Sequence, residues 1–138
     1  MVAVSGCLAG LKCRYDGRSK AAIVTKEPCI VPICPEQMGG LPTPRPAAQF
    51  VGGTGEDVIG GRARVVNARG EDVTAAYLRG GREAVAICKR LNIRKAYLKE
   101  RSPSCGATFV TVDGKLTRGM GVAAAMLTKA GVRIISVR

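Results

Sequence analysis

The sequence contains no histidine. Without imidazole, a Ser-His or Cys-His catalytic pair and a histidine-ligated zinc or haem site are excluded. Acid-base chemistry therefore falls to cysteine, carboxylate, lysine and tyrosine side chains. Any metal site must be ligated by sulfur or by carboxylate oxygen.

Tryptophan is also absent, and aromatic residues make up only 4% of the chain. The apolar fraction is nevertheless 46% of 138 residues, so the core must be built from Val, Ile, Leu and Ala. This composition favours an α/β interior over a β-sandwich, and the length suits one domain with its own core. We therefore predict a single domain spanning residues 1–138.

No apolar segment is long enough to span a bilayer, and residues 1–6 supply only a strand's length of apolar chain. We therefore predict a cytoplasmic protein without a membrane partner. The six cysteines are then expected to stay reduced, because the cytosol does not maintain disulfides. Catalysis or metal binding is the better explanation for the cysteines that lie in loops.

Acidic residues are scarce, since 10 Asp and Glu stand against 22 Lys and Arg, for a formal charge of +12. This charge either serves solubility alone or raises the local concentration of anionic partners such as nucleotides, RNA or phosphorylated metabolites. The basic residues are scattered, and the combination of basic and aromatic residues that stacks RNA bases is missing. We expect no stable nucleic-acid complex.

Short apolar runs alternate with helical patterns along the chain. We predict strands at 2–5, 29–33, 64–67, 93–98 and 132–137, a hairpin at 109–116, and helices at 19–26, from Asp72 or Thr74 to Leu91, and at 120–130. Pro32 places the second strand at a sheet edge. The Gly/Pro-rich stretch 38–61 is predicted to be a binding loop, a lid or a disordered segment.

Alternation of this kind predicts an α/β fold with three layers. We expect a mostly parallel sheet of about four strands, Rossmann-like or flavodoxin-like, with helices on both faces. The helix ending at Leu91 should bury Tyr77, Ala84, Cys88 and Leu91. Cys29 and Cys88 are interpreted as small buried apolar residues of a strand and a helix.

Three further cysteines follow predicted strands, namely Cys7, Cys34 and Cys105. Because the carboxyl ends of parallel strands meet at one edge of a sheet, these thiols should lie close together. Three thiolates without histidine match zinc or an iron–sulfur cluster. Structural zinc sites usually contain CxxC pairs, which this chain lacks, whereas dispersed single cysteines suit a cubane with one open iron. Cys13 remains a fourth ligand, a reactive thiol or a plain loop residue.

Four sequence blocks stand out, namely SGCLAGLKCRYDG at 5–17, CPEQMGGLPTPRP at 34–46, GEDV at 55–58 and KERSPSCG at 99–106. Together they resemble the signatures of one bacterial family whose studied members are thiouracil and thiouridine desulfurases. The resemblance implies a 4Fe-4S cluster held by Cys7, Cys34 and Cys105, with Cys13 a further possible ligand. It also implies non-redox conversion of a thiolated pyrimidine, as base, nucleoside or nucleotide, to its oxo form with release of sulfide.

Polar residues near the three cysteines are candidates for the catalytic groups. Glu36 is ranked first as the base, because it lies two residues after Cys34 and an apolar rim would raise its pKa. Asp16 is ranked second. Ser102 and Ser104 are expected to donate hydrogen bonds and Lys99 to stabilise charge on the ring, with Glu100 a further candidate; Arg45 and residues 52–55 are expected to hold a ribose or phosphate.

Two other functions remain open at this point. The same thiolates can hold zinc or a redox cluster in a binding or sensor module without turnover. A basic domain acting on thiolated tRNA is the third hypothesis.

Overall fold

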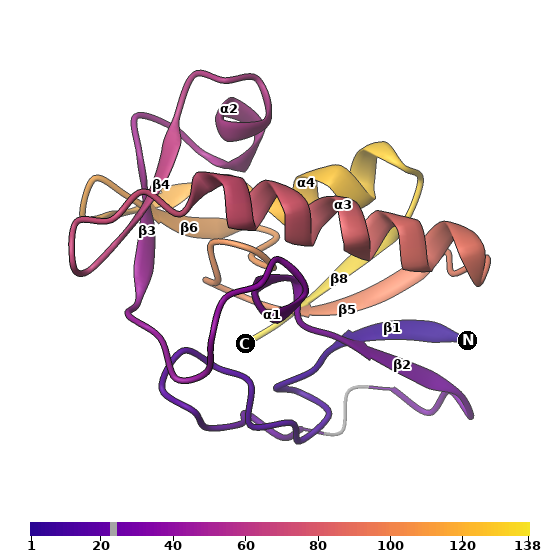
Figure 1. Cartoon of the computed structure of the whole chain (residues 1–138). Coiled ribbons are helices and arrows are strands. Elements are labelled where there is room, and N and C mark those ends of the chain that lie inside the picture. Colours follow the sequence, from indigo (N-terminus) through magenta and orange to yellow (C-terminus); the bar gives the residue numbers. More distant parts are fainter. Residues whose placement is uncertain (23–24) are drawn as a thin grey trace.

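The computed structural model describes residues 1–22 and 25–138. Strands and short helices alternate along the chain (Figure 1). In order, the elements are β1 (Val2–Ser5), β2 (Ile30–Ile33), α1 (Pro35–Met38), β3 (Ala48–Val51), α2 (Gly55–Ile59), β4 (Arg64–Asn67), α3 (Thr74–Arg90), β5 (Lys95–Lys99), β6 (Phe109–Val112), β7 (Lys115–Arg118), α4 (Val122–Lys129) and β8 (Arg133–Val137).

The main sheet contains four parallel strands in the order β2-β1-β5-β8. The predicted α/β class with a mostly parallel sheet is confirmed. Pro32 lies in β2, which is an edge strand as expected, because proline cannot donate to a second neighbour. All four strands run the same way, so their carboxyl ends meet at one edge.

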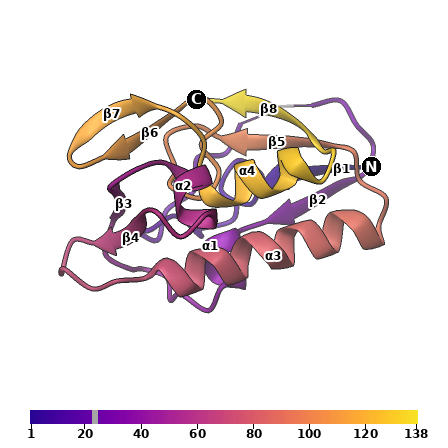
Figure 2. The ribbon, with the colours of Figure 1, turned by 90° about the horizontal axis from the view of Figure 1, so that it is seen from above.

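Two helices, α3 and α4, pack against each other and against the same face of this sheet (Figure 2). Their buried residues include Ala84, Cys88, Ala124 and Leu127, which contact strand residues such as Leu98. The opposite face is covered by the segment after β1, through Leu8 and Cys13. Small side chains allow this close packing, in keeping with the low aromatic content.

In the helix predicted at 19–26, residues 19–22 and 25–26 are not helical in the structure. Residues 23–24 lie outside the described part. The amides of Lys20 and Ala22 instead donate to the carbonyls of Cys7 and Leu8. These bonds hold the segment against the loop after β1. Long-range pairing of this kind overrides a weak local helix signal.

A second sheet has the strand order β4-β3-β6-β7, in which only β3 and β6 pair in parallel. Its strand β3 and helix α2 both fall within 38–61, so the prediction of a long irregular loop is wrong. Phe50 and Val58 bury this stretch in a second core. The sequence signal for α2 is Thr54 followed three residues later by Asp57, whose carboxylate accepts from the Thr54 amide at 2.9 Å.

Helix α3 buries Tyr77, Ala84 and Cys88 as predicted. Leu91 is 42% exposed, because the helix ends at Arg90 and the chain turns away. The hairpin β6–β7 and the strands β4, β5 and β8 agree with the predicted positions to within about two residues. In the described part of the chain, no helix combines the length and apolar character needed to cross a membrane.

Helix α1 was not predicted, and it lies directly on α3 (Figure 1). Two glycines make this contact possible: a Cβ on Gly39 would overlap the Ala76 carbonyl, and one on Gly80 would overlap the Pro35 carbonyl. The backbone of α1 therefore touches that of α3. This contact determines where the residues next to Pro35 lie.

Candidate active site

A cavity of about 380 Å³ lies at the carboxyl ends of β1, β2 and β5. Its walls come from the loop after β1, the start of α1, the segment 45–48, α3 and the loop after β5. Residues of these five segments that line it include Cys7, Cys13, Cys34, Glu36, Arg45, Tyr77, Lys99, Ser102 and Cys105. The volume is in the range of small-molecule sites.

The structure brings Cys7, Cys34 and Cys105 to this one cavity. Cys7 lies two residues past β1, Cys34 directly follows β2 at the start of α1, and Cys105 lies in the loop after β5. Cys7 and Cys105 are buried, and Cys34 is half-buried. Three parallel strands thus deliver one thiol each.

Within residues 1–22 and 25–138, no three His, Cys, Asp or Glu side chains converge as they would around a single metal ion. Ligands of one zinc all lie about 2.3 Å from the same point. Thiolates that bind different irons of a cluster have no such common point. The described residues therefore form no recognisable mononuclear site.

The buried thiols are weakly acidic. Burial raises the pKa of Cys7, and the neighbouring Cys34 adds to this, while Lys99 opposes it. Burial and Glu36 likewise raise the pKa of Cys105, although a hydrogen bond from the Ser5 side chain opposes the shift. Both shifts favour the protonated thiols, and the binding of a metal would have to displace their protons.

Cys13 lies in the same cavity, beside Cys34. The Cys34 thiol donates to the Cys13 carbonyl at 3.8 Å. Burial and the adjacent Cys34 raise the pKa of Cys13 to about 12. Cys13 is thus a buried neighbour of a candidate ligand rather than a plain loop residue.

Glu36 lines the cavity with its side chain 13% exposed. Its Oε2 accepts from Nη2 of Arg45 at 2.7 Å, and its Oε1 accepts from Oγ of Ser102 at 3.4 Å. An apolar rim was expected around Glu36, but the guanidinium of Arg45 lies beside its carboxylate. Glu36 is therefore an oriented carboxylate whose two oxygens are fixed by different segments.

Glu100 also belongs to the cavity lining, but its carboxylate has different partners. One oxygen, Oε1, accepts from the backbone amides of Arg101, Ala107, Thr108 and Phe109, and the other accepts from the Ser136 hydroxyl. Burial opposes ionisation, yet these donors prevail and lower the pKa of Glu100 to about 2. Glu100 thus holds the loop that carries Cys105.

Lys99 lines the cavity, and its ammonium group donates to the Glu100 carbonyl at 3.0 Å. Burial lowers the pKa of Lys99, and the nearby cations Lys20 and Arg14 lower it further. Glu100 opposes this shift, so the repulsion among the three cations is only partly compensated. An anionic group can relieve it.

Ser102 and Ser104 differ in position. The Ser102 hydroxyl lies in the cavity wall, donates to Glu36, and accepts from the amides of Ser104 and Cys105 at 3.1 Å each. Ser104 is fully buried outside the lining, and its hydroxyl has no hydrogen-bond partner among the described residues. Only Ser102 is placed to reach a ligand in the cavity.

Two predicted contributors lie elsewhere. Asp16 is absent from the cavity lining and accepts from the amide of Arg18 at 3.0 Å in a local turn. Residues 52–55 lead into α2, where the Gly55 amide donates to the Met120 carbonyl. Asp16 and residues 52–55 therefore both lie outside the cavity lining, and their predicted roles stay predictions.

The interpretation of Cys29 as a small buried residue is wrong. It is exposed at the start of β2, whereas Cys88 is buried as expected. The amide of Val2 donates to the Cys29 carbonyl, so the backbone of Cys29 is paired while its side chain faces outward. All six cysteines are free.

Sequence reasoning missed Tyr77 and Ser5 and assigned Arg45 another role. Tyr77 lies on the apolar face of α3 but also lines the cavity, where burial and Glu36 raise its pKa. Ser5 is buried at the end of β1 and contacts Cys105 and Lys99. The i, i+4 apolar pattern of α3 concealed Tyr77, because a tyrosine suits a core and a site equally.

Known proteins resemble this chain over nearly its whole length. A family model described as 2-thiouracil desulfurase matches residues 2–138. The uncharacterized protein YbbK of Bacillus subtilis is 46% identical, over 99% of this chain and 95% of its own. A solved structure described as the [4Fe-4S]-dependent thiouracil desulfidase TudS is 39% identical, with a TM-score of 0.82, over 98% of this chain and 89% of its own. The chain therefore belongs to the 2-thiouracil desulfurase family.

Proposed function

We propose that the protein is a 4Fe-4S-dependent desulfurase of thiolated pyrimidines. The observation that carries this proposal is the meeting of three cysteines from three strand ends in one cavity whose wall also holds the oriented carboxylate of Glu36. The family match and the resemblance to TudS support it. The six free thiols fit a reducing compartment, and we place the protein in the cytoplasm.

The residues present fit such a cluster. The donor set is three thiols that line one cavity in a chain without histidine, which is the ligand chemistry of an iron–sulfur cluster. We assign Cys7, Cys34 and Cys105 as ligands, because they follow three adjacent parallel strands. Held by these three thiolates, such a cluster would supply Lewis-acid chemistry toward a thiocarbonyl sulfur.

The reaction we propose is hydrolytic. One water adds to the ring carbon of the C=S group, the C–S bond breaks, and the products are the C=O pyrimidine and hydrogen sulfide, without net redox change. Glu36 serves as the base that takes a proton from this water. Arg45 and Ser102 hold its two oxygens, which leaves the carboxylate one orientation at the cavity wall.

Other groups of the wall complete the proposal. Ser102 contacts the substrate or the cluster sulfur. Lys99 stabilises negative charge that develops on the ring, and its positive surroundings favour anionic substrates, nucleotides among them. Tyr77 keeps its proton because its pKa is raised, so it can act only as a hydrogen-bond donor or acceptor.

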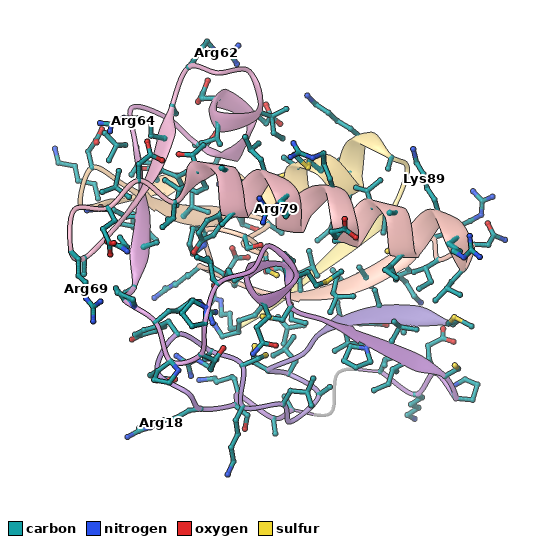
Figure 3. All side chains as sticks on the ribbon, in the orientation of Figure 1. Arg18, Arg62, Arg64, Arg69, Arg79 and Lys89 are labelled. Carbon is teal, nitrogen blue, oxygen red and sulfur yellow. The ribbon has the colours of Figure 1, made fainter. Side chains whose placement is uncertain are left out.

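The surface charge supports a small-molecule substrate over RNA. Exposed cations such as Arg18, Arg62 and Lys89 extend outward from separate parts of the chain (Figure 3). A nucleic-acid face would gather such residues on one surface. We therefore expect no stable nucleic-acid complex.

Anaerobic preparation followed by iron and sulfide quantification tests the cluster, and a panel of thiolated bases, nucleosides and nucleotides tests turnover. We expect brown protein that releases sulfide. Cys105→Ser should lose the cluster, while Cys29→Ser, an exposed cysteine outside the cavity, should keep it. A colourless zinc protein that releases no sulfide would instead establish the binding or sensor module.

A further inference from the structure

Arg45 is an unusual cation in this protein. Its side chain is only 5% exposed, whereas the other arginines that form ion pairs, Arg62 and Arg64, are 65% and 59% exposed. A buried guanidinium needs compensating partners, because desolvation of a charge is costly. The partners of Arg45 therefore indicate why it is buried.

The guanidinium donates to four acceptors. Nη2 donates to Oε2 of Glu36 at 2.7 Å and to the Cys13 carbonyl at 3.1 Å. Nη1 donates to the Thr43 hydroxyl at 3.0 Å and to the Pro42 carbonyl at 3.3 Å. Because a guanidinium is planar and rigid, fixing one nitrogen on loop 42–43 fixes the direction of the other.

Arg45 also joins two walls of the cavity. Its backbone amide donates to the Tyr15 carbonyl at 2.8 Å, and its side chain reaches Cys13 of the same loop and Glu36 of α1. One residue thus links the loop after β1 to the start of α1. Burial opposes the charge, but Glu36 outweighs it, so the pKa of Arg45 is raised and the ion pair is retained.

We propose that Arg45 is a positioning residue that orients the Glu36 carboxylate toward the ligand in the cavity. This inference rests on the proposed function, in which Glu36 acts on water beside the substrate. Without Arg45, only the Ser102 hydroxyl at 3.4 Å would restrain that carboxylate. Misplacement of a catalytic group by about 1 Å costs roughly 100-fold in rate.

The test combines Arg45→Met, Arg45→Lys and Glu36→Gln with the double variant Arg45→Met/Glu36→Gln. Arg45→Met should lower kcat about 10- to 100-fold and leave KM within about threefold, since orientation and not binding is lost. Arg45→Lys should recover part of kcat, because it keeps the charge and one donor. Iron content should stay at the wild-type value in all variants, and Arg62→Met, which breaks an exposed ion pair, should behave as wild type.

The double variant gives the decisive comparison. If Arg45 acts through Glu36, the double variant turns over no more slowly than Glu36→Gln alone. An unchanged kcat in Arg45→Met, or a double variant slowed by the full product of both single effects, would overturn the proposal. A normal kcat in Glu36→Gln would also overturn it, while leaving the desulfurase activity itself intact.

The apoprotein supplies a readout that does not need turnover. The shifts in melting temperature of the single and double variants should be non-additive, because the ion pair is lost only once. Additive shifts would overturn the proposed link between Arg45 and Glu36. If wild-type protein releases no sulfide from any thiopyrimidine, the proposed function fails, and this thermal comparison still decides whether Arg45 holds Glu36.

Discussion

Glu36 and Glu100 both follow closely after strands of the parallel sheet, yet the two glutamates have different partners. Glu100 is bound by four backbone amides and a serine hydroxyl. Glu36 has one guanidinium and one hydroxyl as partners and remains 13% exposed at the cavity. Saturation by backbone donors indicates a structural carboxylate, while open lone pairs beside a cavity leave room for water.

The substitution Glu36→Gln should have the largest effect and tests the difference between Glu36 and Glu100 most directly. The neutral amide keeps the shape of the side chain but cannot take a proton from water, so kcat should fall by about 10²- to 10⁴-fold. Steady-state sulfide release measures this, with iron content and melting temperature as controls. A fall in kcat caused only by cluster loss would contradict the assigned role.

The matched substitution at the second glutamate is Glu100→Gln. Here the loss should be in stability, by about 2–4 kcal/mol, because several buried amides lose a charged acceptor. Urea denaturation of the apoprotein measures it. If the variant unfolds like wild type but stops turning over, Glu100 belongs to the reaction and the distinction between the two glutamates fails.

The pH dependence of folding tests the same difference without a change in activity. The pKa of Glu100 is lowered in the folded state to about 2, from an ordinary value of 4.5. Its contribution to stability is therefore present above about pH 4.5 and is lost as the pH falls toward 2. Melting temperatures of wild type should decline across this interval, and those of Glu100→Gln should decline less.

The smallest effect is expected for Asp16→Asn. Asp16 lies in an exposed turn outside the cavity lining, and asparagine can accept the same hydrogen bond from the Arg18 amide. Stability should change by less than about 0.5 kcal/mol, and kcat should stay close to wild type. A large loss of turnover would return Asp16 to the candidate bases.

Much of the fold could be predicted because it rests on local patterns. The runs Val2–Ser5, which is buried, and Arg133–Val137, which forms a partly exposed edge strand, have the length and composition of parallel strands. The long helix α3 shows its period through Tyr77, Ala84 and Cys88. The predictions fail where long-range contacts determine the local structure. Residues 19–22, for example, pair with the loop after β1 instead of forming a helix.

The site could be predicted in part for a related reason. Any residue just after a parallel strand is delivered to the same sheet edge, so the sequence was sufficient to gather Cys7, Cys34 and Cys105 in one prediction. It could not separate Ser102 from Ser104, which lie two residues apart. Only the turn after β5 directs one hydroxyl into the cavity and buries the other.

The amino-acid sequence by itself determined the class of chemistry and the class of fold. The absence of histidine, the lone cysteines at strand ends and the alternation of strands and helices are properties of the chain alone. The partner of each charged group was decided only by tertiary structure. Glu36 meets Arg45, and Glu100 meets four amides, because α1 rests on α3 through Gly39 and Gly80 and the loop after β5 folds back on itself.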